Sequence, residues 1–322
     1  MTIARLSDLQ SLDEVALACG IEPARIEAFA KAAPQAASYS VLKIPKRSAK
    51  RRNAFRTVYK ANSEALSGFH RSIAMVVVNS ANFGEHVQGF VKKRSTYSNA
   101  RRHVGARLLL HADITAFFDT ITVKQVSEAL VVAGCVPDVA DILARACTID
   151  GYLRQGTRCA PALANLVCQH LDSDMLALAQ NAGAVYTRYA DDMTFSGDVV
   201  PKPASVEQVV KQHGFALRDG RCYQQRRGRN QYVTGLTIAD AKPRLPRRLK
   251  RNLRLTFHYI EKFGLKAHVD KIGADEFEFA RLAGMLRYVH SVEPGLAQKW
   301  SHSLAVGAAK PAPASEPSPP AA

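Results

Sequence analysis

The sequence is poor in acidic residues. Its 322 residues include 28 Asp and Glu against 44 Lys and Arg, which leaves a formal net charge of +16 and a sequence pI near 9.8. This imbalance favours a polyanionic partner, because a positive surface attracts anions at long range and phosphate contacts release counterions from nucleic acid. It does not exclude a basic protein that binds no nucleic acid. Composition therefore favours nucleic-acid binding without establishing it.

Several structural classes are excluded by what the chain lacks. No apolar run approaches the roughly 18 residues that a membrane span needs, and the apolar stretch at the N-terminus contains acids, unlike a signal peptide. No cysteine belongs to a CxxC pair or lies at zinc-ligand spacing from a histidine. We therefore expect a cytoplasmic protein whose thiols are reduced and pack mostly as small core residues. The cysteines are Cys19, Cys135, Cys147, Cys159, Cys168 and Cys222.

Hydrophobic periodicity predicts a mixture of helices and strands. Residues 39–56 are expected to form two extended arms joined by a basic loop, since they contain seven Lys or Arg and no acid. The run 184–197 predicts a hairpin, because residues of high β propensity flank Ala190-Asp191-Asp192. Helices are also expected at 5–31, 59–83, 122–133, 162–179 and 204–213, and strands at 106–114 and 231–238.

The composition changes after residue 240. The segment 242–254 carries seven basic residues and no acid, and two helices are expected at 246–263 and 274–290. The sequence after about 305 is rich in proline and alanine and cannot offset its ordering entropy with apolar burial, so disorder is expected there. The positions expected to be buried by the second helix are Phe277, Phe279, Leu282, Leu286 and Val289.

Paired aspartates at the tip of the predicted hairpin indicate a metal site. Phosphoryl transfer to a nucleotide uses divalent ions, and two such ions need carboxylates that converge from different chain segments. Asp191 and Asp192 supply one pair, and Asp113, at the end of an apolar strand, supplies the third if the strands are neighbours. Mg2+ suits such a site because it prefers oxygen ligands. A bare Asp-Asp pair is more often only a solvated turn, so the interpretation depends on the surrounding motifs.

Three motifs, in order, resemble those of reverse transcriptases. The run DITAFFDTI (113–121) resembles the first carboxylate motif of that family, and YADD (189–192) resembles the second. Between them, Gln155-Gly156 followed by APALAN (160–165) resembles the nucleotide-positioning motif. The separations are also those usual in the family.

Two further elements narrow the resemblance to the retron reverse transcriptases of bacteria. NARRH (99–103) resembles their NAxxH element, and VTG (233–235) resembles their VTG element. The first is expected to organise the junction between fingers and palm or to contact RNA, and the second to lie near a template–primer strand. The similarity runs from about residue 39 to residue 293. The chain departs from the family pattern at Arg154, Ala160 and Arg221, where Pro, Ser and often Lys are usual.

The resemblance implies an α+β fold of the right-hand polymerase type, with fingers, a palm built on an antiparallel sheet, and a helical thumb. The implied division of the chain is an N-terminal helical segment (1–35), fingers and palm (36–240), a helical thumb (241–304) and a disordered Pro/Ala-rich tail (305–322).

The same resemblance implies roles for charged residues. Asp113, Asp191 and Asp192 are expected to be catalytic and to hold two Mg2+ ions. Lys46 and Arg52, on the basic loop, resemble the pair that closes on the incoming deoxynucleoside triphosphate (dNTP). A solvated basic loop is the alternative for that pair.

Roles follow for residues around the nucleotide as well. Phe118 occupies the family's steric-gate position, where a ring against the sugar leaves no room for a 2′-hydroxyl. A core aromatic is the alternative, for which Phe117 is the better candidate. Gln155 is expected to hydrogen-bond the nucleotide, and Gly156 to let backbone approach it closely.

The resemblance implies an RNA-directed DNA polymerase that copies a cognate structured non-coding RNA. Synthesis would start from a 2′-hydroxyl and yield branched RNA–DNA, and a probable effector protein would complete an anti-phage defence system. The alternatives are another bacterial reverse transcriptase, of the maturase, diversity-generating or abortive-infection type, or an RNA-binding scaffold that restrains an effector. The NAxxH and VTG elements argue against the other reverse transcriptases, and the intact set of aspartates argues against a pure scaffold.

Overall fold

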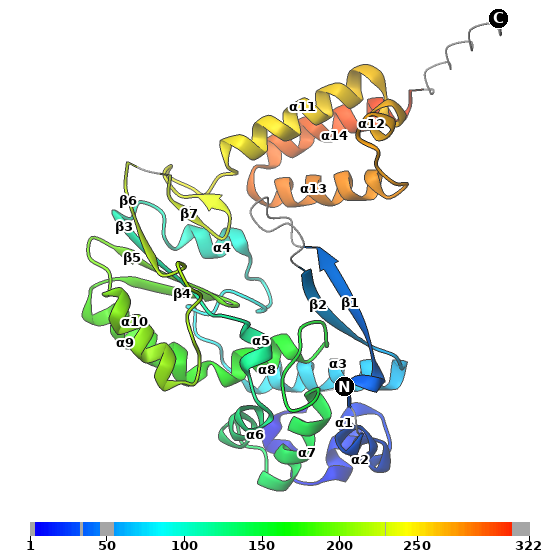
Figure 1. Ribbon diagram of the computed structural model, residues 1–322, viewed down its shortest axis with the longest axis vertical. Coiled ribbons are helices and arrows are strands. Elements are labelled where there is room, and N and C mark those ends of the chain that lie inside the picture. Colours follow the sequence, from blue (N-terminus) through cyan, green and yellow to red (C-terminus); the bar gives the residue numbers. More distant parts are fainter. Residues whose placement is uncertain (1–3, 33–34, 46–54, 229, 311–322) are drawn as a thin grey trace, which may run out of the picture. The chain divides into compact units, whose positions relative to one another are not determined.

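A computed structural model describes residues 4–32, 35–45, 55–228 and 230–310. The chain divides into two compact units (Figure 1). The first unit comprises Met1–Ser95 and Ala106–Arg226, and the second comprises Thr96–Gly105 and Arg227–Ala322. This division differs from the expected one, because residues 96–105 and 227–240 group with the C-terminal helices. Across the described residues, no helix combines the length and apolar character needed to cross a membrane.

The first unit contains a four-stranded antiparallel sheet in the order β4-β5-β3-β6. The central strand β3 buries Leu109, Leu110 and Ala112, as its apolar sequence predicts. Helix α9 packs against β4, and α10 packs against α9. The strands are β3 (Leu108–Asp113), β4 (Val185–Tyr189), β5 (Asp192–Gly197) and β6 (Tyr223–Arg226).

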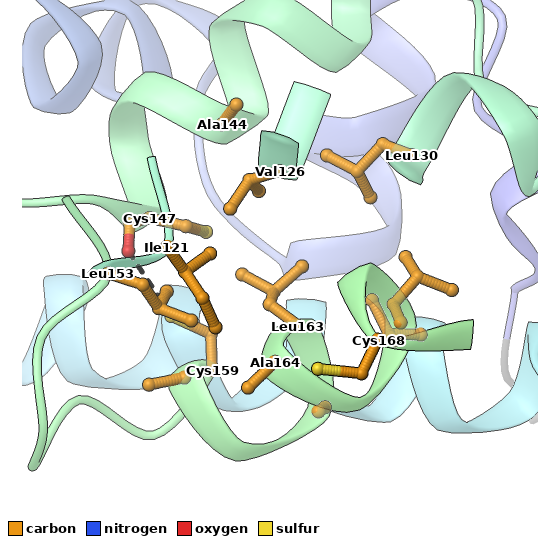
Figure 2. Packing of buried hydrophobic residues seen from close by; sticks show 14 of the residues in the cluster. Ile121, Val126, Leu130, Ala144, Cys147, Leu153, Cys159, Leu163, Ala164 and Cys168 are labelled. Carbon is orange, nitrogen blue, oxygen red and sulfur yellow. Dashed lines mark hydrogen bonds between the residues drawn. The ribbon is translucent and has the colours of Figure 1, made fainter. Parts of the chain in front are cut away.

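Helices form the rest of the core of this unit. Thr122 caps α6 as predicted, its hydroxyl accepting from the Gln125 amide. Figure 2 shows Val126 and Leu130 of α6 packed over Leu163 of α8 in the buried cluster. The helices are α1 (Leu12–Cys19), α2 (Pro23–Lys31), α3 (Glu64–Ser80), α5 (Phe117–Thr120), α6 (Val123–Val132), α7 (Pro137–Cys147), α8 (Ala160–Val167), α9 (Gln169–Asn181) and α10 (Pro203–Gln212), with 3-10 turns at Leu6–Asp8 and Gln35–Ser38.

The predicted extended arms form an antiparallel hairpin of β1 (Tyr39–Pro45) and β2 (Phe55–Ala61). The helix expected from residue 59 begins only at Glu64, because residues 59–61 complete the pairing with β1 and the Ser63 hydroxyl caps the helix. The single helix expected at 162–179 is two helices. Cys168 separates α8 from α9 because its ψ of 2° departs from the helical value.

The second unit combines a short hairpin with helices (α4 in cyan and the rest from yellow to red in Figure 1). The strand expected at 231–238 is instead two strands, because Thr234 and Gly235 both have positive φ and form a tight turn. Helix α4 packs against this hairpin, and α11 packs against α14. The elements are α4 (Thr96–Arg101), β7 (Tyr232–Val233), β8 (Leu236–Thr237), α11 (Arg247–Phe263), α12 (Leu265–Ile272), α13 (Glu278–Val292) and α14 (Pro294–Ala308).

Two expectations for these helices were wrong. Leu282, Leu286 and Val289 of α13 are buried, but Phe277 and Phe279 are 60% and 49% exposed. These two rings lie at the start of α13, before its buried face is established. In addition, α14 was not predicted, and it continues through Ala308, so the first residues of the segment expected to be a tail are helical.

Candidate active site

Strand pairing brings the predicted carboxylates to one end of the sheet. Asp113, the last residue of β3, pairs directly with Asp192, the first residue of β5. Strands β4 and β5 are joined by the two-residue turn Ala190-Asp191, and the φ of 59° at Ala190 makes that turn possible. The Ile114 amide donates to the carbonyl of Asp191 (3.1 Å), which fixes the turn against the end of β3. The hairpin expected around the paired aspartates is therefore present.

These carboxyl groups repel one another. Burial, and next the charge of Asp191, raise the pKa of Asp113, against the opposing charges of Arg218 and Arg221. Burial of its carboxyl group, and next the charges of Asp191 and Asp113, raise the pKa of Asp192 to about 6, although the residue as a whole is exposed. Asp113 Oδ1 is buried and faces the guanidinium of Arg218 without a hydrogen bond of good geometry. Crowded carboxylates whose charges repel one another are a donor set that fits a divalent cation.

Two arginines partly neutralise this cluster. The guanidinium of Arg218 lies 3.0 Å from Asp113 Oδ1 and 3.7 Å from Asp191 Oδ2, and Arg221 Nε lies 3.6 Å from Asp113 Oδ2. Backbone pairing positions them, because the Arg218 amide donates to the Asp113 carbonyl (2.7 Å) and Leu217 bridges to Ile114. Arg218 was not predicted from the sequence. The sequence gives one signal for it, because Arg218 lies close to Arg221 and is separated from it only by Asp219-Gly220.

A buried polar network lies behind the turn. Arg188 is fully buried on β4, and its guanidinium binds both carboxylate oxygens of Asp172 on α9 (2.7 and 2.6 Å). The same guanidinium donates to Asn165 Oδ1 (3.1 Å) and to the carbonyl of Ala190 (3.2 Å). Tyr186 donates its hydroxyl to Asp172 as well (2.9 Å). Neither Arg188 nor Asp172 was predicted to matter, because long-range pairing of this kind leaves no local pattern in the sequence.

A third segment closes on the same turn. Val87 forms a parallel bridge to Arg188, and Asn165 donates to the carbonyl of Gly89 (2.9 Å). A Cβ at Gly89 would lie 2.5 Å from the Ala190 amide nitrogen, so only glycine fits there. Asn165, which belongs to the predicted nucleotide-positioning motif, thus links the segment at Gly89 to Arg188.

The two phenylalanines of the first motif have different surroundings. Phe117 is 4% exposed and belongs to the core, as expected. Phe118 is only partly buried, and its ring centre lies 6.1 Å from that of Phe90. The partial exposure leaves Phe118 able to contact a ligand. Its expected role against the sugar stays a prediction.

The Gln155-Gly156 segment contacts the β1–β2 hairpin. The Tyr59 amide donates to the carbonyl of Gln155 (2.8 Å). Gly156 has a φ of +110°, and a Cβ there would lie 2.5 Å from the Tyr59 carbonyl oxygen. The close approach that Gly156 permits in this structure is therefore to β2. Arg154 donates to Asp119 Oδ1 (2.9 Å), while Lys46 and Arg52 lie outside the described residues.

The NAxxH and VTG elements lie together in the second unit. Asn99 and His103 are buried, at 2% and 1% exposure. Helix α4, which carries Asn99, packs against β7 and β8, and the Thr234 hydroxyl donates to the Thr96 carbonyl (2.9 Å). Each element therefore supports the other, although they are far apart in the chain.

Helix α11 carries an exposed basic face. Leu253, Phe257 and Ile260 are buried, and the opposite face is arginine-rich. Two other basic residues of the predicted cluster are held in ion pairs within the unit, Arg244 with Asp240 (2.8 Å) and Lys250 with Glu293 (3.2 Å). The exposed arginines of α11 are Arg247, Arg248, Arg251 and Arg254.

Comparison of the sequence with known proteins identifies its family. The family model for reverse transcriptase (RNA-dependent DNA polymerase) matches residues 44–219. The chain is 29% identical to the retron Mx162 reverse transcriptase of Myxococcus xanthus, over 90% of this chain and 65% of that protein. It is 30% identical to the retron Mx65 reverse transcriptase of the same organism, over 89% of this chain and 69% of that protein.

A relative from another organism gives the same result. The chain is 29% identical to the retron Ec86 reverse transcriptase of Escherichia coli, over 69% of this chain and 70% of that protein. The chain thus spans about two thirds of the length of these curated relatives. It belongs to the bacterial retron reverse transcriptase family.

Proposed function

We propose that this protein is an RNA-directed DNA polymerase whose catalytic residues are Asp113, Asp191 and Asp192. The observation that carries the proposal is the direct pairing of Asp113 with Asp192 beside Asp191, in a cluster whose carboxyl charges repel one another. The three carboxylates would hold two Mg2+ ions. Bound there, the ions would supply activation of the attacking hydroxyl and neutralisation of the leaving pyrophosphate.

The residues of the chain contribute orientation and charge. Arg218 and Arg221 pair with Asp113 in this structure, and with the carboxylates holding cations they would be free to bind the phosphates of a dNTP. Phe118 would lie against the sugar and exclude a 2′-hydroxyl. Gln155 and Gly156 would contact the nucleotide from the segment that packs on β2, with Lys46 and Arg52 reaching its triphosphate.

The proposal extends to the parts of a right-hand polymerase. The four-stranded sheet is the palm, the β1–β2 hairpin belongs to the fingers, and helices α11–α14 are the thumb. The arginine face of α11 suits a folded or hybrid duplex, which proteins bind through phosphates and 2′-hydroxyls. The family model covers residues 44–219, which supports the assignment of fingers and palm but does not reach the helices of the proposed thumb.

The proposed template is a cognate structured non-coding RNA. Synthesis would start from an internal 2′-hydroxyl of that RNA, so the product would be single-stranded DNA joined to RNA through a 2′–5′ branch. Holding one hydroxyl in line with the phosphate is the main contribution a protein can make to such a displacement. With an effector protein, the complex would act in defence against phage.

The test is to isolate nucleic acid from cells that express the protein from its native locus. The sample is treated with RNase and then with a debranching enzyme, and the Asp191→Asn variant serves as the control without synthesis. A short single-stranded DNA that shifts in size on debranching, and is absent from the variant, supports the proposal. Free DNA begun from a 3′-hydroxyl would agree with the polymerase assignment but would contradict priming from a 2′-hydroxyl.

A further inference from the structure

A second cluster of possible metal ligands lies apart from the aspartates, in the helical core of the first unit. His70 of α3, Cys147 at the end of α7 and Cys159 just before α8 each offer one ligand atom, and these atoms all lie within 4.8 Å of one another. The three side chains are at most 1% exposed. The two cysteines appear in Figure 2, among the apolar residues of the core. Local spacing in the sequence could not reveal the cluster, because the three residues come from separate segments of the chain.

His70 has the hydrogen-bond pattern of a metal ligand. Its Nε2 lies 3.2 Å from the carbonyl oxygen of Ala146 and 3.4 Å from the Tyr39 hydroxyl. Its Nδ1 is buried and has no hydrogen-bond partner among the described residues. In the tautomer whose Nε2–H donates to Ala146, Nδ1 keeps an unused lone pair. Histidines that bind metals commonly donate their other ring N–H to a backbone carbonyl in this way.

The two sulfurs and their surroundings define the kind of ion. Thiolate and imidazole ligands together select zinc and similar thiophilic ions over Mg2+ or Ca2+. The Cys159 sulfur also lies 3.7 Å from the Thr157 hydroxyl, so hydroxyl oxygens of Thr157 and Tyr39 border the cluster. Three buried Cys and His ligands supply most of a tetrahedral zinc site, and an adjacent oxygen can complete the four-fold coordination.

We propose that His70, Cys147 and Cys159 bind one structural Zn2+ ion, with the hydroxyl oxygen of Thr157 as the fourth ligand. Binding would release the protons of the two thiols to solvent. Atoms around a tetrahedral zinc lie roughly 3.8 Å apart when both are sulfur, so the ligands need to draw together by about 1 Å at most. Cys147 and Cys159 lie at helix ends, where that adjustment is small.

The site would have a defined structural effect. Cys147 and Cys159 bracket the segment that contains Gln155 and Gly156, and His70 belongs to α3. A metal ion bound to all three would fix that segment relative to the helical core. The inference concerns the core alone and holds whether or not the protein synthesises DNA.

The experiment uses the full chain, expressed without a polyhistidine tag and purified without chelators. Zinc is measured by plasma mass spectrometry, and Zn2+ is added to a chelator-treated sample to determine the recovered stoichiometry. We expect about one zinc per chain in the wild type and less than about a tenth of that in the Cys147→Ser/Cys159→Ser variant. Cys168→Ser, which removes another fully buried thiol outside the cluster, should keep its zinc.

Cobalt gives a readout that does not depend on a variant folding. Co2+ bound to the wild type should show the absorption of a tetrahedral ion together with sulfur-to-metal charge transfer. Zinc content that is equal in the wild type and the double variant would overturn the site. So would cobalt spectra without the sulfur band, or a Cys147–Cys159 disulfide found by mass spectrometry in the protein as purified.

Discussion

Arg188 and Asp172 form a fully buried ion pair directly behind the turn that carries Asp191. Both carboxylate oxygens of Asp172 accept from the Arg188 guanidinium, whose remaining nitrogen holds Asn165 and the Ala190 carbonyl. Exposure of the two side chains is 0% and 2%. Because a buried pair rarely adds much net stability, its value here lies in holding the turn in one position. Arg188 is therefore a positioning residue for the aspartates.

The first prediction concerns that pair. Replacement of Arg188 by Met should lower the free energy of unfolding by about 3–5 kcal/mol, because Asp172 is left as an uncompensated buried charge. The double variant Arg188→Met/Asp172→Leu should recover part of this loss. Urea unfolding measures both. The double variant should nevertheless remain impaired in DNA synthesis, since the Ala190 carbonyl has lost its donor; normal synthesis in a stable double variant would contradict the positioning role.

The second prediction concerns Asp192, whose pKa is raised to about 6 from an ordinary value of 3.8. A raised pKa in the folded state means that the protonated carboxyl favours folding. This contribution is complete below about 3.8 and is lost as pH rises through about 6. Without divalent cations, the free energy of unfolding of the wild type should therefore fall over this interval relative to that of Asp192→Asn.

Added Mg2+ should make the wild type more stable than Asp192→Asn at neutral pH. The ion stabilises the wild type by binding the folded state, whereas Asp192→Asn should respond weakly and should make no DNA on a primed RNA template. RNA binding by the variant should stay close to that of the wild type, which serves as the control for folding. Substantial DNA synthesis by Asp192→Asn or Asp191→Asn would end the assignment of the catalytic aspartates.

Short-range patterns predicted the active-site scaffold well. The apolar run ending at Asp113 and the β-rich arms around Ala190 are local signals, and both strands formed as expected. Features that depend on contacts between distant segments could not be predicted in this way. Arg218 reaches the aspartates through a bridge at Leu217, and Asp172 was indistinguishable from any polar residue on a helix.

Similar limits explain the errors made for the second unit. Residues 231–238 have the composition of a strand, but the positive φ of Thr234 and Gly235 turns them into a hairpin. Phe277 has the spacing of a buried residue, and yet it precedes the first turn of α13. The tight turn determines the structure of residues 231–238, and the start of α13 determines the exposure of Phe277.

The third prediction tests the partly exposed ring at Phe118. Phe118→Ala should reduce discrimination against ribonucleotides by about tenfold or more, because the side chain no longer fills the space of a 2′-hydroxyl. Single-nucleotide incorporation with matched dNTP and NTP measures the ratio. Phe90→Ala removes the neighbouring ring and serves as the control. Unchanged discrimination would identify Phe118 as part of the core.

The fourth prediction separates backbone strain from steric contact at Gly156. Gly156→Ala should destabilise the protein by more than Gly151→Ala does, and should raise the KM for dNTP. Both glycines have positive φ, but only at Gly156 would a Cβ meet backbone, 2.5 Å from the Tyr59 carbonyl oxygen. Strain alone costs on the order of 1–3 kcal/mol at either site. Equal unfolding midpoints for the two variants would show that the contact with β2 is easily relieved.

The last prediction concerns RNA binding by α11. Changing Arg247, Arg248 and Arg251 to Gln should weaken RNA binding and flatten its salt dependence, because each lost phosphate contact removes about one counterion from the slope. Affinities measured at several salt concentrations give that slope. The matched control replaces an equal number of exposed lysines in the first unit. Each of these lysines pairs with an acidic residue one helical turn away. Its lysines are Lys31, Lys124 and Lys211. If the control variant flattens the slope as much as the α11 variant, the effect reflects net charge and the arginine face is not the RNA-binding surface.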